Sequence, residues 1–349
     1  MASKIALLQI NPIVGDISGN ASLIKSLADQ ASLAGASLAV TTELAISGYP
    51  PRDLLLQSDF VNACHDTASS MDSTIPILVG TPVPSLGDRS LPGNGVVRAG
   101  DSVREVTRKQ LLPTYDVFDE ARYFEADERP GIARTIAGLD IGVTICEDAW
   151  QHCGATPNDY DSDPIAQIVE WGRQGVLLDA TVNLSASPYH ANKSGIRIAV
   201  ARSAAASLNH PFLLANQVGG NDDLLFDGRS VIAWPNGTVV VAPAWMEGVL
   251  IADLSNPEDC IWLGDGDIII LDPEDDIEDD DEDLLDAIII GLSDYCKKSG
   301  ISKIVLGLSG GIDSALAACV ASAAVGAGNV TGISMPSRHS SQHSIDDAK

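Results

Sequence analysis

A run of acidic residues around residue 280 constrains the fold of this chain more than any other stretch of its sequence. Eleven of the fifteen residues in 272–286, DPEDDIEDDDEDLLD, are aspartate or glutamate. Because burying so many like charges is costly, the run must stay in solvent and cannot belong to a core. We therefore predict two folded parts, at residues 1–258 and 284–349, joined by an acidic connector at 259–283.

Before the connector, apolar runs alternate with amphipathic stretches and then give way to short strands. Strands are expected at 4–12, 37–42, 75–82, 95–99, 103–107, 139–145, 175–182, 212–217, 230–234, 239–242 and 248–254. Helices are expected at 20–35, 53–71, 165–173 and 191–208, the first two capped by Asn20 and Asp53. The pattern predicts an α/β fold in which helices pack outside two facing mixed sheets.

Charge and cysteine content narrow the possible partners and the cellular compartment. The formal net charge of -27 argues against nucleic acid as a partner, because phosphate binding needs clustered lysine and arginine. No apolar run reaches the length of a membrane span. Six cysteines without a CxxC pair indicate reduced thiols, and MASKIALLQINP reads as a first strand rather than a signal peptide. We expect a cytoplasmic protein.

Three dispersed residues, Glu43, Lys109 and Cys146, suggest a thiol site that cleaves amides. A thiolate splits amide hydrolysis into two easier steps through a thioester, but the thiol needs a base and a nearby cation. Glu43 and Cys146 each follow a predicted strand, where layered α/β folds build their sites. Two alternatives stay open: an inert buried cysteine, or a metal site that adds His152 and Cys153, although no second ligand cluster accompanies them.

The blocks TELAISGYPPRDLL, KQLLPTYDVFDEARYF, ICEDAW and NLSASPYHANK resemble the carbon–nitrogen hydrolase (nitrilase) superfamily. Within it they resemble the glutaminase domain of glutamine-dependent NAD synthetases, from about residue 4 to about 255. The resemblance implies a four-layer α-β-β-α sandwich that forms homo-oligomers. It implies Glu43 as general base, Lys109 as oxyanion stabiliser and Cys146 as nucleophile. It also implies a glutamine pocket lined by Tyr115, Glu120, Ser187 and Lys193.

After the connector, a helix is expected at 284–298, and SGGIDS lies between a predicted strand, 303–308, and a predicted helix, 314–325. Glycines and a helix N-terminus suit a pyrophosphate, and Asp313 is a candidate Mg²⁺ ligand. The loop resembles that of the N-type ATP pyrophosphatases, and VTGISMPSRHSSQHSIDDA resembles NAD synthetases, with His339 replacing their usual tyrosine. The resemblance implies a Rossmann-like doubly wound domain that binds ATP through Ser309, Gly310, Gly311, Ile312, Asp313 and Ser314.

Together the two resemblances imply a ligase that makes NAD with glutamine as the ammonia source. Glutamine is hydrolysed at Cys146, and the ammonia is used with ATP to amidate deamido-NAD, releasing AMP and pyrophosphate. The implied partners are glutamine, deamido-NAD and ATP with Mg²⁺, without a prosthetic group or a membrane. Only about forty residues follow Ser309, so we expect an incomplete synthetase domain and a chain competent for the glutaminase step alone. The alternatives are a stand-alone amidase with a vestigial C-terminal segment, or a non-catalytic nucleotide-binding scaffold.

Overall fold

The computed structural model describes residues 4–87, 91–278, 281–338 and 341–348, without the side chains of 344 and 345. The predictions for His339 and for part of the acidic run, 279–280, lie outside these ranges. Within them, none of the helices combines the length and the apolar character that crossing a membrane requires. The chain divides into two compact units, Met1–Val218 with Phe226–Asp279, and Gly219–Leu225 with Asp280–Lys349.

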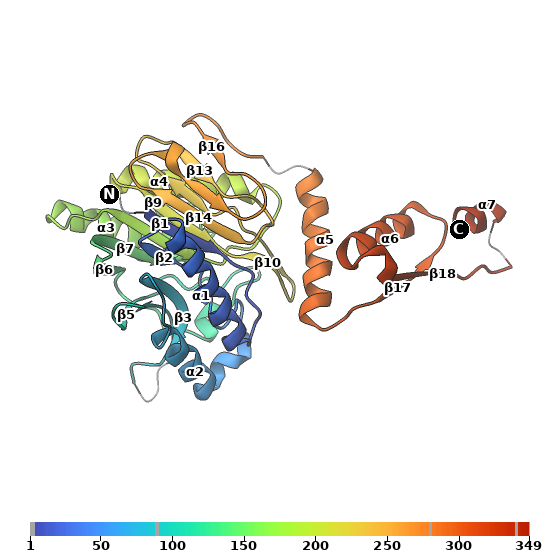
Figure 1. Cartoon of the computed structure of the whole chain (residues 1–349), viewed down its shortest axis with the longest axis horizontal. Helices are drawn as coiled ribbons and strands as arrows, with labels where there is room; N and C mark the ends of the chain where they lie inside the picture. Colours follow the sequence, from blue (N-terminus) through green and yellow to red (C-terminus); the bar gives the residue numbers. More distant parts are fainter. Residues whose placement is uncertain (1–3, 88–90, 279–280, 339–340, 349) are drawn as a thin grey trace. The chain divides into compact units, whose positions relative to one another are not determined.

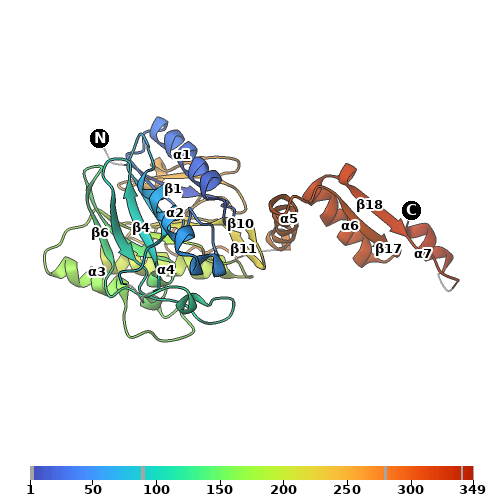
Figure 2. The same ribbon diagram turned by 90° about the horizontal axis from the view of Figure 1, so that it is seen from below.

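The first unit contains two seven-stranded mixed sheets of similar build (Figures 1 and 2). The first sheet has the order β15-β14-β1-β2-β3-β4-β5. Its strands are β1 (Lys4–Gln9), β2 (Leu38–Val40), β3 (Ile77–Val83), β4 (Gly93–Ala99), β5 (Arg104–Arg108), β14 (Gly248–Asp253) and β15 (Ile261–Leu263). Strands β1, β2 and β3 run parallel, and the remaining neighbours pair antiparallel.

The second sheet has the order β16-β13-β12-β9-β8-β7-β6, with β7, β8 and β9 parallel. Its strands are β6 (Gly131–Ile136), β7 (Leu139–Ile145), β8 (Ala180–Ser185), β9 (Phe212–Asn216), β12 (Val231–Ala233), β13 (Val239–Val241) and β16 (Ile269–Leu271). In both sheets the parallel strands are buried on both faces, as the near-continuous apolar runs of the sequence predict.

Three apolar clusters show how the layers stack. One cluster fills the space between the two sheets, with Leu7 and Leu250 on one side and Val143 and Leu213 on the other. A second lies under α1 (Ile17–Leu33) and α2 (Ser58–Ser69), and a third under α3 (Pro164–Arg173) and α4 (Lys193–Leu208). Figure 2 shows α1 and α4 on opposite sides of the strands. The order helix, sheet, sheet, helix is the predicted four-layer sandwich.

Several predicted boundaries are wrong, and each has a local cause. The strand expected at 175–182 is β8, 180–185, because Gly175 adopts φ 89° in the turn that ends α3. Strand β6 and the hairpin of β10 (Val218–Asn221) and β11 (Leu224–Asp227) were not predicted. The predicted connector 259–283 contains β15 and β16, which each add an edge strand to one sheet. Its acidic residues at 272–278 are exposed, as expected, whereas 281–283 already belong to the next helix, where Asp283 is half-buried.

The two predicted N-caps are also corrected. Asp16 caps α1 by accepting the N–H of Gly19 at 2.9 Å. Asn20 is buried inside the helix instead, where its side chain bonds the backbone of Ile13 and Ile46. Asp53 lies in the 3-10 turn η1 (Arg52–Leu56), which precedes α2.

The second unit contains two parallel strands and the helices that follow the acidic run. Helix α5 (Asp281–Lys298) begins with three acids and ends with two lysines, an arrangement that suits the helix dipole. Strands β17 (Ile304–Leu308) and β18 (Val330–Ser334) flank α6 (Ile312–Val325), and α7 (Gln342–Asp347) follows. This strand–helix–strand segment is the beginning of a doubly wound sheet, as predicted.

Candidate functional site

A fully buried ammonium group lies between two buried carboxylates in the first unit. Lys109 follows β5, and its Nζ lies 2.8 Å from Oε1 of Glu43 and 2.7 Å from Oε2 of Glu120. None of the Lys109 or Glu43 side chain is exposed, and 5% of Glu120 is. Buried charges of this kind persist only when paired and hydrogen-bonded. The structure thus brings together three residues that lie far apart in the sequence.

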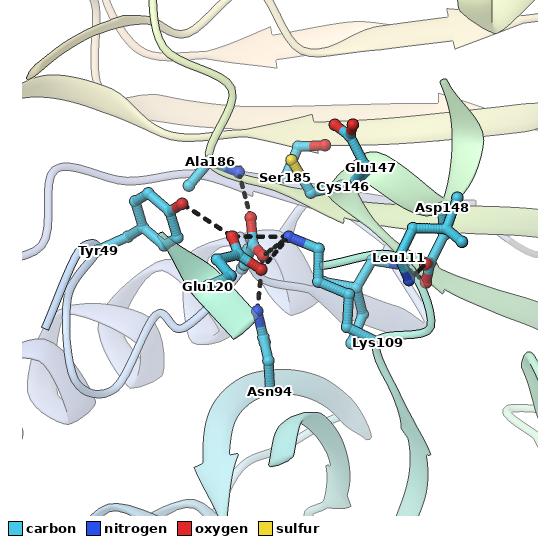
Figure 3. A network of polar contacts seen from close by, with 12 residues as sticks. Tyr49, Asn94, Lys109, Leu111, Glu120, Cys146, Glu147, Asp148, Ser185 and Ala186 are labelled. Carbon is cyan, nitrogen blue, oxygen red and sulfur yellow. Dashed lines mark hydrogen bonds and ion pairs between the residues drawn. The ribbon is translucent and has the colours of Figure 1, made fainter. Parts of the chain in front are cut away.

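Hydrogen bonds and close packing hold the Glu43 carboxylate in a fixed position. Asn94 on β4 donates its Nδ2 to Glu43 Oε1 at 2.7 Å, and the N–H of Ala186 donates to Oε2 at 3.1 Å (Figure 3). A Cβ at Gly80 of β3 would overlap the backbone oxygen of Thr42, so a glycine there lets the turn at Glu43 pack directly against the strand. Glu43 is therefore presented in one orientation.

Glu120 lies in the 3-10 turn η2 (Glu120–Arg122) and is bonded on its far side by a tyrosine. Tyr49 donates its hydroxyl to Glu120 Oε1 at 2.8 Å. Burial raises the pKa of Glu120 to about 7, although the neighbouring Lys109 and the Tyr49 hydroxyl act in the opposite direction. For Lys109, burial lowers the pKa, but the carboxylates of Glu120 and Glu43 outweigh it and hold the pKa well above its usual value. We conclude that the ammonium keeps its charge.

Cys146 occupies the first position of the 3-10 turn η3 (Cys146–Ala149), directly after β7. Its φ of 42° is rare for a residue with a side chain, and such backbone strain is found preferentially at functional sites. The thiol is 5% exposed and lies beside Lys109 (Figure 3). Burial, followed by the charge of Glu43, raises its pKa well above the usual value, while Lys109 lowers it. The resting thiol is protonated, so attack on a substrate needs a proton acceptor.

A second set of polar side chains surrounds the residue after Cys146. Glu147 is 4% exposed, and its Oε1 accepts the hydroxyls of Tyr115 at 2.7 Å and Tyr160 at 3.1 Å. Lys193, the first residue of α4, places its Nζ 4.1 Å from the ring centre of Trp150, in a cation–π contact. Burial, followed by Arg197, lowers the pKa of Lys193. A carboxylate and an ammonium thus lie near the thiol.

The remaining predicted pocket residue, Ser187, is buried behind the end of β8. Its backbone N–H donates to Oδ1 of Asn216 at 2.9 Å, which holds the segment after Ala186 in place. His152, raised as a metal-ligand alternative, instead bonds Asp163 and Ser207 through its two ring nitrogens, each at 2.8 Å. In the described ranges no group of three or more possible metal ligands comes together.

Sequence reasoning did not single out several residues that bond to the predicted ones or to their immediate sequence neighbours. They are Tyr49, Asn94, Glu147, Asp148 and Tyr160. Glu147 and Asp148 belong to the block ICEDAW and Tyr49 to TELAISGYPPRDLL, so their proximity to candidate residues was a usable signal. Nothing in the sequence around Asn94 or Tyr160 indicates a role in a site.

In the second unit, the loop SGGIDS joins β17 to α6 and bonds to itself. Ser314 donates its Oγ to the Gly311 carbonyl at 2.9 Å, and the Gly311 N–H donates to Ser309 Oγ at 3.2 Å. Gly310 adopts φ 79°, which a residue with a side chain rarely takes. A cavity of about 630 Å³ is lined by Leu308, Gly310, Gly311, Ile312, Ser314, Ala315, Ala318, Asp347 and Ala348. Asp313 and Ser309 are not among these lining residues.

Comparison with known proteins yields matches along most of the chain. A family model described as carbon-nitrogen hydrolase matches residues 4–258, and one described as NAD synthase matches residues 284–349. The glutamine-dependent NAD(+) synthetases of Synechocystis sp. and Rhodobacter capsulatus are 41% and 35% identical to this chain over 99% of its length. The matches cover 61% and 59% of those relatives, so the chain spans about three fifths of their length.

Solved structures give the same picture of the fold. The glutamine-dependent NAD+ synthetase from Acinetobacter baumannii, solved in complex with adenosine diphosphate, matches with a TM-score of 0.83 at 30% identity. That match covers 99% of this chain and 62% of the other. An amidase from Nesterenkonia sp. matches with a TM-score of 0.59 at 21% identity, over 72% of this chain and 90% of the amidase. The predicted fold class is confirmed.

Proposed function

The chain belongs to the carbon–nitrogen hydrolase family through residues 4–258, and we propose that this part hydrolyses the side-chain amide of glutamine through a cysteine thioester. One observation carries the proposal. A strained, buried Cys146 lies beside a buried ammonium, Lys109, that is paired with the carboxylates of Glu43 and Glu120. Such an arrangement supplies the nucleophile, the proton acceptor and the oxyanion partner that amide cleavage needs.

In the first step, Sγ of Cys146 attacks the carbonyl carbon of the amide while Glu43 accepts the thiol proton. The carbonyl electron pair moves to oxygen, and the Lys109 ammonium stabilises the resulting negative charge. When the tetrahedral intermediate collapses, the carbon–nitrogen bond breaks and Glu43 donates its proton to the departing nitrogen. Ammonia leaves, and the acyl group remains on Cys146 as a thioester.

In the second step, water attacks the thioester and Glu43 takes a proton from it. Collapse of this intermediate breaks the carbon–sulfur bond, Glu43 returns the proton to Sγ of Cys146, and glutamate is released. Glu120 does not react in either step. Its role is to hold the Lys109 ammonium through two hydrogen bonds while the charge on the substrate oxygen appears and disappears.

Glutamine carries an α-carboxylate and an α-ammonium group in addition to its amide. The pocket we propose has one side chain of opposite charge for each of them. Lys193 is a partly buried cation suited to the carboxylate, and the carboxylate of Glu147 suits the ammonium. Tyr115 holds Glu147 by its hydroxyl, and Ser187 forms the adjoining wall. This arrangement would favour an amino-acid amide over a neutral aliphatic amide.

The direct test is detection of the covalent intermediate. Purified protein mixed with glutamine should release glutamate and ammonia, and acid quenching should trap a thioester on Cys146 that mass spectrometry locates. Cys146→Ala should abolish both without unfolding the protein, because alanine fits the space of a thiol but cannot form the bond. Cys153→Ala is the matched control, since Cys153 is exposed, lies seven residues on, and should leave turnover unchanged. Substantial glutaminase activity in Cys146→Ala would refute the assignment.

For the whole protein we propose ATP-dependent amidation of deamido-NAD to NAD, with the ammonia from glutamine. The similarity to glutamine-dependent NAD(+) synthetases over 99% of the chain supports this, as does the NAD synthase match at 284–349. ATP phosphates are assigned to the SGGIDS loop, residues 309–314. Mg²⁺ would be held by the phosphates with one carboxylate. Asp313 is the sequence-based candidate, but Asp347, not Asp313, lines the cavity, so the observed lining does not favour Asp313.

The second activity is tested separately from the first. ATP-dependent formation of NAD from deamido-NAD, with glutamine or free ammonia as nitrogen source, would support the ligase assignment. Glutaminase activity without NAD formation is the result expected of a chain competent for the glutaminase step alone, and a stand-alone amidase would give the same result. That alternative has less support, because the amidase likeness shows the fold alone. Intact residues at all three catalytic positions argue against a non-catalytic scaffold.

Two further expectations remain proposals. We propose a cytoplasmic location, which the six free cysteines support, because reduced thiols persist in that compartment. A homo-oligomeric state follows from the family resemblance alone, and measurement of the mass in solution would test it.

A further inference from the structure

We propose that Asp148 is a positioning residue that fixes the Lys109 segment against the turn carrying Cys146. The inference rests on the proposed amide hydrolysis, because it assigns Asp148 a part in that reaction. Asp148 is the third residue of the turn η3 and is 1% exposed. It touches neither the thiol nor the ammonium, so its effect would be exerted through the backbone.

The contacts of Asp148 join two segments that carry different catalytic groups. Its Oδ1 accepts the backbone N–H of Gln110 at 3.0 Å and that of Leu111 at 2.9 Å, directly after Lys109. Its Oδ2 accepts the N–H of Ile145 at 3.0 Å, directly before Cys146. Figure 3 shows Asp148 facing Leu111 on the side of the site away from Glu120. One side chain therefore bonds the neighbours of both catalytic residues.

Such a bridge is needed because Lys109 and Cys146 come from different sheets. Lys109 follows β5 in the first sheet, and Cys146 follows β7 in the second. The two sheets are held together mainly by apolar side chains, whose packing is non-directional. Hydrogen bonds to a carboxylate are short and directional. The three hydrogen bonds that Asp148 accepts can keep the distance between the Lys109 ammonium and the Cys146 thiol nearly constant, as catalysis requires.

The same bonds also support the strained backbone at Cys146. A positive φ at a residue with a side chain persists only where the surroundings over-determine it. The Asp148 side chain closes the first turn of η3 by accepting the Ile145 N–H, while Asn183 donates its Nδ2 to the Cys146 carbonyl at 3.2 Å. The carboxylate thus fixes the direction in which the thiol points as well as its distance from Lys109.

The test is the pair Asp148→Asn and Asp140→Asn in the full chain. Asparagine at 148 keeps one oxygen for Gln110 and Leu111 but turns an NH₂ group toward the Ile145 N–H, which breaks the bridge on the Cys146 side. Asp140 is the matched control because it lies near the start of β7, the strand that precedes η3, and also accepts a backbone N–H, that of Thr135 at 2.8 Å.

We expect kcat for glutamine hydrolysis to fall roughly 10²-fold in Asp148→Asn, because misplacement of about 1 Å has that effect. KM should stay close to the wild-type value, since the proposed glutamine-binding side chains are untouched. Asp140→Asn should leave both constants unchanged. A folded Asp148→Asn enzyme with wild-type kcat, or one in which only KM or thermal stability changes, would overturn the inference.

If Asp148→Asn does not fold, Gln110→Pro tests the bridge from its other end. Proline at 110 has no N–H to donate to Oδ1 of Asp148. A folded Gln110→Pro enzyme should also lose kcat with little change in KM, and wild-type turnover would overturn the inference. Failure of both variants to fold would make Asp148 a structural residue and would overturn it as well. If the unaltered protein does not hydrolyse glutamine, it is the proposed function that fails.

Discussion

Lys109 is a cation with no exposed surface, and both of its partners are buried carboxylates. An isolated charge in that position would be strongly disfavoured, so each member of the cluster depends on the others. The same dependence explains why the predicted base and oxyanion partner are bonded to one another. It also makes the cluster sensitive to conservative substitutions.

Lys109→Met should inactivate glutamine hydrolysis and destabilise the protein. Methionine keeps the volume but leaves two carboxylates unpaired, which typically costs about 3–5 kcal/mol, and loss of an oxyanion partner lowers kcat roughly 10²-fold or more. Urea unfolding and a glutamate-release assay measure the two effects. Adding Glu120→Gln should recover part of the stability without recovering activity.

Lys25→Met is the matched control for this prediction. Lys25 pairs with Asp29 at 3.6 Å on the surface, where an ion pair contributes about 0–1 kcal/mol. Equal losses of stability in Lys25→Met and Lys109→Met would contradict the view that the buried cluster is energetically coupled.

The pH dependence of turnover should respond to Tyr49. Burial raises the pKa of Glu120 to about 7, so the carboxylate that holds Lys109 is ionised above that pH and is lost as the pH falls through it. kcat/KM should therefore decline on the acid side of neutrality. Tyr49→Phe removes a hydrogen bond that lowers the Glu120 pKa, so the acid limb should move to higher pH.

Comparison of pH profiles separates Glu120 from Asp148, a second buried acid near the site whose pKa burial also raises to about 7. Because Tyr49 bonds Glu120 and not Asp148, Tyr49→Phe should leave the Asp148 pKa, and its effect on the pH profile, unchanged. Tyr123→Phe, which removes an exposed tyrosine–carboxylate bond to Asp53, is the control. If the fall of kcat/KM at acid pH occurs at the same pH in Tyr49→Phe as in the wild type, protonation of Glu120 is not its cause.

At the scale of elements, the N-terminal end of α1 contains two polar residues with different roles, a helix cap and a buried side chain that bonds the backbone. Asp16 accepts one N–H at the helix start, whereas Asn20 satisfies three buried or half-buried backbone groups of Ile13 and Ile46. The sequence pattern could not separate the two, because aspartate and asparagine are both strong N-cap residues. Their surroundings in the fold distinguish them.

The two residues should therefore differ in their effect on stability. Asp16→Ala should cost about 1 kcal/mol, the usual value for an N-cap. Asn20→Ala should cost at least about 2 kcal/mol, because the buried Ile46 carbonyl and the part-buried Ile13 N–H lose this partner, at about 1–3 kcal/mol for each group left unsatisfied. Chemical denaturation measures both, and Ser18→Ala, an exposed change in the same turn, should lie within about 0.5 kcal/mol of wild type. A larger loss in Asp16→Ala than in Asn20→Ala would contradict this assignment.

At the scale of the whole molecule, the charge of -27 acts as a general repulsion, to which the acidic run 272–286 contributes eleven of the 48 acidic residues. Such repulsion disfavours the compact state and is screened by salt, with a Debye length of about 10 Å at 0.1 M. The acidic residues in 272–278 are exposed and add to this repulsion.

Stability should therefore increase with salt. Between low salt and about 0.5 M NaCl we expect a gain of about 1 kcal/mol or more, which for a chain of this size raises Tm by at least about 1.4 °C. Replacing the exposed Glu274 and Glu278 by glutamine should reduce the salt response. A Tm that is flat or falls with NaCl would show that repulsion is not what limits the stability.

The sequence by itself determined the layered fold and the candidate catalytic residues. Strands buried on both faces can be recognised in the sequence as continuous apolar runs, and amphipathic helices by the 3.6-residue spacing of their apolar residues. Both signals exist because each buried position favours an apolar side chain. The acidic run indicated where exposure was unavoidable. Glu43, Lys109 and Cys146 could be named because local blocks around them are distinctive, and the strand ends that carry them were mostly correct.

Tertiary structure alone decided how these residues meet. Nothing near Asn94 predicts that it bonds Glu43, and nothing near Tyr49 predicts a bond to Glu120, because both contacts join segments more than fifty residues apart. The same holds for Asp148, whose neighbours at 110 and 111 come from the other sheet. Hydrogen bonds of this kind depend on the packing distance between layers, and that distance is a property of the assembled core rather than of any single stretch of sequence.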